Sequence, residues 1–196
     1  MDVKQAVEFG EIIREKISEL YVDGFYDDGL RYFSKNKEKL KKAFAPMFVI
    51  EYFYVAVIDN EIAGMIGCMN KEKFCLNINM KIFVKHLGIF GGLMAYFANK
   101  NFLNKFKTVT NEKTAIPEFL VTDTKYRKRG VAATLMNYLL ALPEYEHYIV
   151  EVADTNIASL ELCKKLGYKE ISRKKFIPGS GINEWVRMKY SKKEKP

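Results

Sequence analysis

The chain has 196 residues, of which 48% are hydrophobic, so it can bury one sizeable core and is near the usual length of a single domain. Lys and Arg outnumber Asp and Glu by 32 to 24, and the net charge of +8 favours an anionic partner such as nucleic acid, an acidic membrane or a phosphorylated small molecule. The basic residues are scattered, and their clusters lack the interleaved aromatic residues of a base-stacking surface. We therefore expect a solvated lysine-rich surface and no nucleic-acid partner.

The cysteines and the amino terminus indicate the compartment. Cys68, Cys75 and Cys163 have neither the spacing of metal ligands nor the even number of a disulfide framework, which favours a reducing compartment and no metal site. The opening MDVKQAVEFGEIIREK contains acidic residues and no continuous apolar segment, so it is unlike a secretory signal. We expect a cytoplasmic protein.

Two helices and a hairpin are predicted first. Apolar residues recur at helical spacing from Glu8 to about Tyr26, and KNKEKLKKAFAPMF predicts a second helix that ends near Pro46. In FYVAVIDNEIAGMIGCMN, two β-rich runs flank a short polar connection at residues 59–61, which predicts an antiparallel hairpin.

The next segment predicts a strand around Phe74 to Ile78 and a helix over roughly Ile82 to Leu103. Within it, Leu87 to Ala98 is uncharged, but its twelve residues fall short of the roughly 20 that a membrane-spanning helix needs. Gly88 and Gly92 have the spacing that lets helices approach closely. We expect a buried or interface helix that could supply a homodimer contact, and no membrane partner.

The last third alternates strands and helices. PEFLVTD predicts a strand, and a helix follows from Gly130 until Pro143. HYIVEV predicts the next strand, TNIASLELCKKLG a helix that ends at a glycine, and YKEISRKKF with EWVRMKY a final strand pair joined by IPGSG. Strand, helix and strand in this order imply a parallel pair within a mixed sheet. The predicted fold class is mixed α/β (α+β), with one domain over residues 1–196.

A basic turn precedes the helix from Gly130. Amides at a helix start lack intrachain acceptors and carry partial positive charge, so the turn Arg127, Lys128, Arg129 suits a pyrophosphate. Gly130 and the small Ala132 leave the main chain accessible to a ligand. The pattern is neither a Walker A loop nor the dinucleotide fingerprint, and by itself an ordinary basic helix start explains it equally well.

Two spaced motifs resemble the GNAT superfamily of N-acetyltransferases. Arg127, Gly130 and Ala132 match the acetyl-CoA signature of that superfamily, which is Arg or Gln, two residues, Gly, one residue, then Gly or Ala. In the family an Asn follows some 25 to 30 residues later and opens a helix that ends in leucine, glycine and an aromatic residue. Asn156 and the run from Leu166 to Tyr168 match this second motif.

The resemblance covers a signature region at residues 116–190 well and the hairpin at 53–69 fairly. It leaves residues 1–46 and 71–114 as variable, acceptor-side regions. It implies a GNAT-like fold: a central, mostly antiparallel twisted sheet with a splayed parallel strand pair and helices on both faces. It also implies acetyl-CoA as co-substrate and transfer of its acetyl group to an amine.

The resemblance places the pantetheine arm in the gap between strands at 118–122 and 148–152, where backbone groups of Leu120 and Thr122 would hold it. Asn156 would hydrogen-bond the pantetheine amide or cap its helix, and both roles are compatible. Ser159, about one turn further on, could face the same ligand. The implied coenzyme-binding residues are Leu120, Val121, Thr122, Arg127, Lys128, Arg129, Gly130, Val131, Ala132, Asn156 and Ser159.

An amine with a pKa near 10 must lose a proton before it attacks a thioester, so a carboxylate is the expected base. Glu118 is the first candidate, because strand periodicity places Glu118, Leu120 and Thr122 on one face and the family often carries its base on this strand. A carboxylate at the rim of the strand is the alternative interpretation. Glu151, on the neighbouring strand, is the second candidate.

Cys163 stands where many members of the family have the tyrosine that protonates the departing thiolate. A thiol could donate this proton, although a buried structural cysteine is the more common role. Near the predicted acceptor pocket, Tyr26, Asp27 and Asp28 could form an acidic, aromatic wall for a cationic amine, or a solvated turn packed by its aromatic residues.

The sequence therefore predicts an acyltransferase that moves an acetyl group from acetyl-CoA to a primary amine in a ternary complex. The alternatives are a coenzyme A-binding module with weak turnover and, less favoured, a basic nucleic-acid-binding protein. The sequence does not identify the amine.

Overall fold

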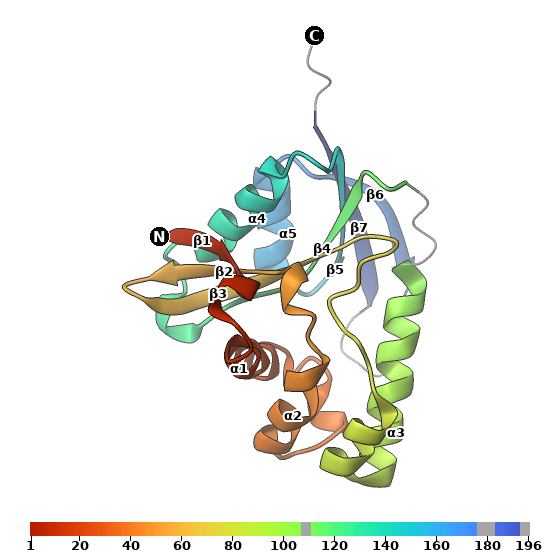
Figure 1. The fold of residues 1–196 in the computed structure, drawn as a ribbon. Coiled ribbons are helices and arrows are strands. Elements are labelled where there is room, and N and C mark those ends of the chain that lie inside the picture. Colours follow the sequence, from red (N-terminus) through yellow and green to blue (C-terminus); the bar gives the residue numbers. More distant parts are fainter. Residues whose placement is uncertain (107–110, 176–182, 193–196) are drawn as a thin grey trace.

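The computed structural model describes residues 1–106, 111–175 and 183–192. Their strands form one sheet in the order β1-β2-β3-β4-β5-β7-β6, in which β4 and β5 are parallel and all other neighbours antiparallel (Figure 1). The strands are β1 Asp2–Gln5, β2 Phe53–Ile58, β3 Glu61–Met69, β4 Thr114–Thr122, β5 His147–Ala153, β6 Lys169–Lys175 and β7 Glu184–Ser191.

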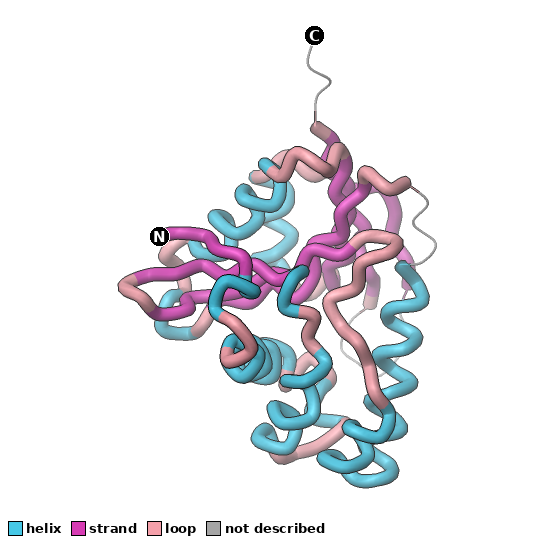
Figure 2. The backbone as a smooth tube through the Cα atoms, viewed as in Figure 1, coloured by secondary structure: helices cyan, strands magenta, loops and turns pink. Residues whose placement is uncertain are grey.

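Helices cover both faces of the sheet, and the predicted mixed α/β class with a mostly antiparallel sheet is confirmed (Figure 2). Each face has its own hydrophobic core, one shared with α1, α2 and α3 and the other with α4 and α5. The α-helices are α1 Ile13–Phe25, α2 Lys37–Phe44, α3 Met80–Phe106, α4 Val131–Ala141 and α5 Ile157–Lys165, and the short 3-10 helices are η1 Ala6–Phe9, η2 Leu30–Tyr32, η3 Ala45–Met47, η4 Ile50–Tyr52 and η5 Thr124–Tyr126.

The hairpin of β2 and β3 forms as predicted. Asp59 and Asn60, which join the strands, both have a positive φ, as a two-residue turn between right-twisted strands requires. Strand β1 was not predicted, and it pairs with β2 at the edge of the sheet. The predicted strand at Phe74 to Ile78 is wrong, because only Leu76 forms an isolated bridge, to Phe48.

A cluster of aromatic rings packs α1 and α2 against the sheet. The Tyr21 ring centroid lies 5.0 Å from that of Phe44, 5.4 Å from Phe48 and 5.4 Å from Phe119. Aromatic pairs at these distances add stabilisation beyond the area that they bury. The cluster therefore fixes α1 against β4, the strand that carries the candidate base.

Helix α3 is longer than predicted and is broken near its start. Gly88 has φ 77° and ψ 174°, so a short first segment turns into a second one that begins at Ile89. Gly92 makes the turn compact, since a Cβ there would lie 2.5 Å from the Cα of Val84. Of the two expected roles, a buried or an interface helix, burial is wrong for its outer face, where Phe90 is 90% exposed, and the interface role stays a prediction. The connection predicted at residues 177–181 lies outside the described residues.

Candidate active site

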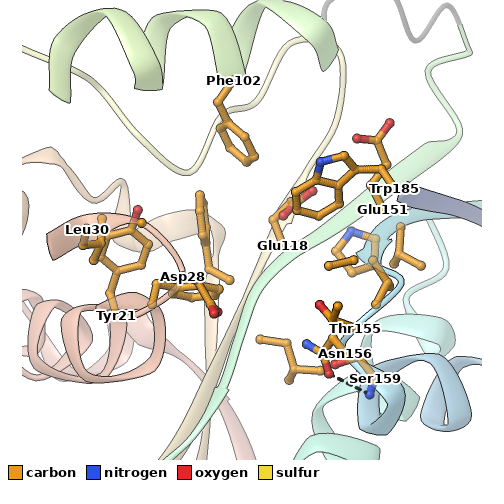
Figure 3. Close-up of a pocket in the computed structure, with 18 of the residues that line it drawn as sticks. Tyr21, Asp28, Leu30, Phe102, Glu118, Glu151, Thr155, Asn156, Ser159 and Trp185 are labelled. Carbon is orange, nitrogen blue, oxygen red and sulfur yellow. Dashed lines mark hydrogen bonds between the residues drawn. The ribbon is translucent and has the colours of Figure 1, made fainter. Parts of the chain in front are cut away.

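A cleft of about 780 Å³ opens where β4 and β5 separate. The two strands pair only from Thr114 to His147 and from Ala115 to Tyr148, so the predicted splayed parallel pair is confirmed. Figure 3 shows Glu118 in the middle of the cleft, with Tyr21, Asp28 and Leu30 on one side and the start of α5 on the other.

A bulge in β4 sets the direction of Glu118. Phe119 has φ 57°, and it adds a residue to β4 between two pairs with β3, Glu118 with Gly67 and Val121 with Met65. A Cβ on Gly67 would meet the side chains of Cys75 and Phe119, which belong to the core of α1 to α3, so its partner Glu118 points to that face too.

Beyond the bulge the alternation is reversed. Leu120 packs in the core of α4 and α5, and Thr122 pairs with Gly64, whose Cβ would meet Val131 of α4. The prediction that Glu118, Leu120 and Thr122 share one face is therefore wrong, because the extra residue at the bulge shifts the two-residue period of the strand.

Glu118 is the most perturbed acid in the cleft. Burial raises its pKa to about 8, the ammonium group of Lys105 opposes this rise, and the negative charge of Glu151 adds to it. A carboxylate with a pKa in this range can accept a proton from an ammonium group near neutral pH, which a free carboxylate does poorly. The environment is that of a general base.

Glu151 has a different environment. Its Oε2 lies 2.8 Å from Lys105 Nζ, and its Oε1 accepts hydrogen bonds from Arg187 Nη2 at 2.6 Å and Nε at 3.0 Å. Burial alone would raise its pKa, but the hydrogen bonds and charges of Lys105 and Arg187 outweigh burial and lower it. Glu151 is thus held ionised by two cations, which makes it a weaker base than Glu118.

The basic turn lies at the start of α4. Gly130 is the N-cap residue with φ 81°, and because glycine has no side chain, none caps the first amides of the helix. Lys128 also has a positive φ of 61°. Turns of this kind direct successive N–H groups at one anion. Arg127, Lys128 and Arg129 are exposed, and the next two residues of the implied set, Val131 and Ala132, form the first turn of α4.

Contacts that no sequence motif predicted hold this turn in place. Tyr126 is buried, and its hydroxyl donates to Glu61 Oε2 at 2.5 Å on the β2–β3 hairpin. The guanidinium carbon of Arg129 lies 5.3 Å from the centroid of the Tyr126 ring. Lys125 pairs with the same Glu61 oxygen at 2.6 Å. The turn is therefore fixed from the hairpin side while its cations face solvent.

Asn156 and Ser159 line the cleft at the start of α5. The Oδ1 atom of Asn156 accepts a hydrogen bond from the backbone N–H of Ser159 at 3.1 Å, which caps the helix (Figure 3). The capping role is thus present, and the amide NH₂ of Asn156 is a further donor for a ligand.

Cys163 lines the same cleft but is only 4% exposed. Burial raises the pKa of its thiol to about 11. A thiol with a raised pKa keeps its proton, so it is a poor nucleophile and a weak donor to a departing thiolate. The geometry favours packing over catalysis at this position.

The acidic turn after α1 is only partly in the cleft. Asp27 and Asp28 line it, and Asp27 forms an exposed ion pair with Arg31 at 3.7 Å. Tyr26 is not among the lining residues: its hydroxyl donates to the carbonyl of Lys35 at 2.9 Å, so it braces the loop. The interpretation of Tyr26 as a wall residue is therefore not supported by its position.

Three lining residues had no signal in the sequence. Phe102 and Lys105 come from the end of α3, and Trp185 from β7. The Lys105 ammonium lies over the Phe102 ring at 5.0 Å and over the Trp185 ring at 5.6 Å. They meet only through the tertiary fold, and no local motif marks them.

In the part of the chain that the structure describes, no group of three or more His, Cys, Asp or Glu side chains could hold a metal ion.

Comparison with protein families agrees with this arrangement. A family model described as "Acetyltransferase (GNAT) family" matches residues 14–168. The chain belongs to the GNAT acetyltransferase family. The resemblance inferred from the two sequence motifs is thus confirmed, and no individually curated protein matches the sequence.

Solved structures with the same fold cover almost the whole chain. An N-acetyltransferase from Staphylococcus aureus Mu50 has a TM-score of 0.65 at 17% identity, covering 97% of this chain and 100% of its own. An acetyltransferase of the GNAT family from Bacillus cereus ATCC 10987 has a TM-score of 0.58 at 10% identity, with 98% of each chain covered. An aminoglycoside 6'-acetyltransferase type Ii has a TM-score of 0.57 at 15% identity, with 100% of each covered. At these identities the likeness concerns the fold.

Proposed function

We propose that this GNAT acetyltransferase moves the acetyl group of acetyl-CoA to a primary amine within a ternary complex. The observation that carries the proposal is the position of Glu118, whose pKa is raised to about 8, in the cleft where β4 and β5 separate. A carboxylate of this kind suits the deprotonation of an ammonium group before attack on a thioester.

The residues around the cleft fit acetyl-CoA. The uncapped amides at the start of α4, with Arg127 and Arg129 beside them, suit a pyrophosphate. Beyond Ala115 the edge of β4 that faces β5 has no strand pairing, which leaves backbone groups for an extended amide-bearing arm. Asn156 and Ser159 line the same cleft. When bound there, acetyl-CoA would supply an activated acetyl thioester.

The protein's own contribution is proton transfer and positioning. Glu118 accepts a proton from the ammonium group of the acceptor, directly or through a water molecule. Asp27 and Asp28, together with the rings of Tyr21 and Phe102, border the side of the cleft where a cationic amine would approach. On the opposite wall Glu151 is ionised, but it is paired with both Lys105 and Arg187, so its negative charge is neutralised there.

The test is coenzyme A release from acetyl-CoA with a panel of primary amines, for wild type and for Glu118→Gln. We expect turnover with at least one amine and a fall of about 10²- to 10⁴-fold in kcat for Glu118→Gln, the usual contribution of a general base. Calorimetry with coenzyme A checks binding separately, and charge reversal at Arg127 and Arg129 should weaken it. Failure to bind coenzyme A would refute the proposal.

A second candidate is a coenzyme A-binding protein with weak turnover, favoured by the buried Cys163 thiol at the expected position of the proton-donating tyrosine. Coenzyme A release over the amine panel separates the two candidates, and Cys163→Ala tests whether the thiol takes part. If Cys163 only packs, kcat should stay within about threefold of wild type, because no proton passes through the thiol. Strong coenzyme A binding without release, over the whole amine panel, would favour the second candidate.

A further inference from the structure

The outer face of α3 is an apolar surface that the proposed reaction does not use. Between Ile89 and Ala98, the exposed positions of the helix are all apolar: Ile89, Phe90, Leu93, Met94, Phe97 and Ala98. Ile89 is 67% exposed, Phe90 90% and Phe97 53%. The positions repeat at helical spacing, so they form one continuous stripe. We call these six residues the α3 stripe.

The helix under the α3 stripe is firmly held by the domain. Ala95, Asn99 and Leu103 on its inner face are buried, and Gly91 packs against the carbonyl of Phe33. Helix α3 is long and apolar enough to cross a membrane by length and composition alone. The break at Gly88 and the packed inner face argue against spanning and in favour of a helix that presents one face outward.

The charges on helix α3 itself have one sign. From Lys73 to Asn111 the sequence contains no Asp or Glu, whereas it contains six lysines. Of these, Lys81, Lys85 and Lys100 are exposed on α3, on both sides of the stripe along the helix. The neighbouring loop at residues 26–36 adds no net charge, because it has two acids, Asp27 and Asp28, and two bases, Arg31 and Lys35.

These observations identify the partner by its chemistry. A two-fold dimer in which the α3 stripes pack antiparallel would bring Lys100 of one copy towards Lys85 of the other, and these like charges repel each other. An anionic bilayer offers hydrocarbon to the apolar side chains and negative headgroups to the lysines. The second segment of α3, which begins at Ile89, would lie in the plane of such a surface.

We propose that this protein binds peripherally to anionic lipid bilayers through the α3 stripe and its flanking lysines. The inference is independent of the proposed acetyl transfer. It is linked to the cleft by Ala98, which is exposed on α3 and also lines the cleft, so the docked helix would hold the cleft next to the bilayer.

The test is cosedimentation of the whole protein with phosphatidylcholine vesicles, with and without phosphatidylglycerol. We expect binding to the mixed vesicles that weakens as salt is added and that is much weaker with phosphatidylcholine alone. Phe90→Ser with Met94→Ser should lower the affinity at least about tenfold, because the apolar area that enters the bilayer is lost. Lys85→Gln with Lys100→Gln should lower it about fivefold for each lysine.

Matched controls remove as many groups of the same kind elsewhere. Ile12→Ser with Ile171→Ser replaces two exposed apolar side chains, and Lys164→Gln with Lys165→Gln replaces two exposed lysines of α5, on the other face of the sheet. Both controls should bind as wild type does, and thermal midpoints should show that all four variants fold.

The proposal is overturned if wild type binds no vesicle, or if Phe90→Ser with Met94→Ser binds as wild type does. A dimer that the Phe90 and Met94 substitutions disperse, without vesicle binding, would overturn it in favour of a second copy.

Discussion

The Lys105 ammonium lies 2.8 Å from Glu151 Oε2, and so the end of α3 is tied to β5 across the mouth of the cleft. The same charge acts on Glu118 of β4, where it opposes the rise in pKa that burial causes. One lysine is thus shared between carboxylates on the two strands that separate. Only Glu151 receives the additional hydrogen bonds of Arg187, which accounts for the different behaviour of the two acids.

The first prediction concerns the pH profile of catalysis. If Glu118 is the base, kcat/KM should rise with pH through about 8, because only the ionised carboxylate accepts a proton. Lys105→Met removes a charge that lowers the pKa of Glu118, so the rise should move to higher pH. The profile is measured with one amine at saturating acetyl-CoA.

Arg187→Met is the matched control for this shift. It also removes a cation from Glu151, but Arg187 is not among the groups that shift the pKa of Glu118. The pH of the rise should therefore stay where it is in wild type. Equal shifts in both variants would mean that the profile follows Glu151.

The second prediction concerns stability and pH. The pKa of Glu118 is about 8 in the folded protein, above its ordinary value of 4.5, so its contribution to stability is present below the lower value and is lost as pH rises through the higher one. The glutamine side chain of Glu118→Gln does not ionise, so the stability of this variant does not fall through this pH range. Relative to wild type, the variant should thus gain stability between pH 5 and pH 9, on the order of a few kcal/mol.

Thermal midpoints of both proteins across this pH range measure the effect, and each kcal/mol corresponds to a shift of roughly 2–4 °C in a chain of this size. Glu161→Gln, on the exposed side of α5, is the control and should keep a constant difference from wild type. A constant difference for Glu118→Gln as well would show that Glu118 is ionised alike in folded and unfolded chains.

Local motifs predicted the place of the cleft better than the directions and partners of the side chains that line it. The separation of β4 from β5 and the turn at Gly130 follow from short segments whose physical requirements are local: a helix start, a positive φ and cations beside it. The direction of the Glu118 side chain could not be predicted from the sequence. The bulge at Phe119 arises from pairing with β3, and a phenylalanine gives no sign of a positive φ. Lys105 reaches Glu151 across 46 positions of the chain, beyond any periodicity.

Two short segments were predicted wrongly for a related reason. The strand β1, DVKQ, has little apolar content and forms because β2 offers it an edge. The segment around Leu76 has an apolar, β-like composition but makes only one bridge, because the neighbouring residues pack between helices and the sheet. In both cases tertiary context outweighs the local pattern.

The third prediction separates backbone conformation from ligand access at Gly130. Its φ is 81°, and a Cβ built there meets nothing within 4 Å. Gly130→Ala should therefore destabilise the protein by roughly 1–2 kcal/mol through backbone strain alone. Gly130→Asn should cost less, because asparagine tolerates this conformation. Thermal midpoints measure both effects.

Calorimetry with coenzyme A completes this comparison. Each variant places a Cβ beside the first amides of α4, so both should weaken binding although only one is strained. If Gly130→Asn binds coenzyme A as tightly as wild type, close approach to this backbone is not required. If neither variant is destabilised, the left-handed conformation at Gly130 is wrong.

The fourth prediction concerns the acceptor. Asp28 and Asp27 line the cleft, and Asp27 is already paired with Arg31, so Asp28 should contribute more to the attraction of a cationic amine. Asp27→Asn with Asp28→Asn should raise the KM for the amine about fivefold or more, with most of the effect in Asp28→Asn, because each lost attraction is worth about 1 kcal/mol at a partly exposed site. The KM for acetyl-CoA should not change, since the basic turn of α4 is intact.

Asp23→Asn is the control, because Asp23 pairs with Lys37 and does not line the cleft. An amine KM that is the same in all variants would place the acceptor against another wall, where Glu151 and Trp185 lie.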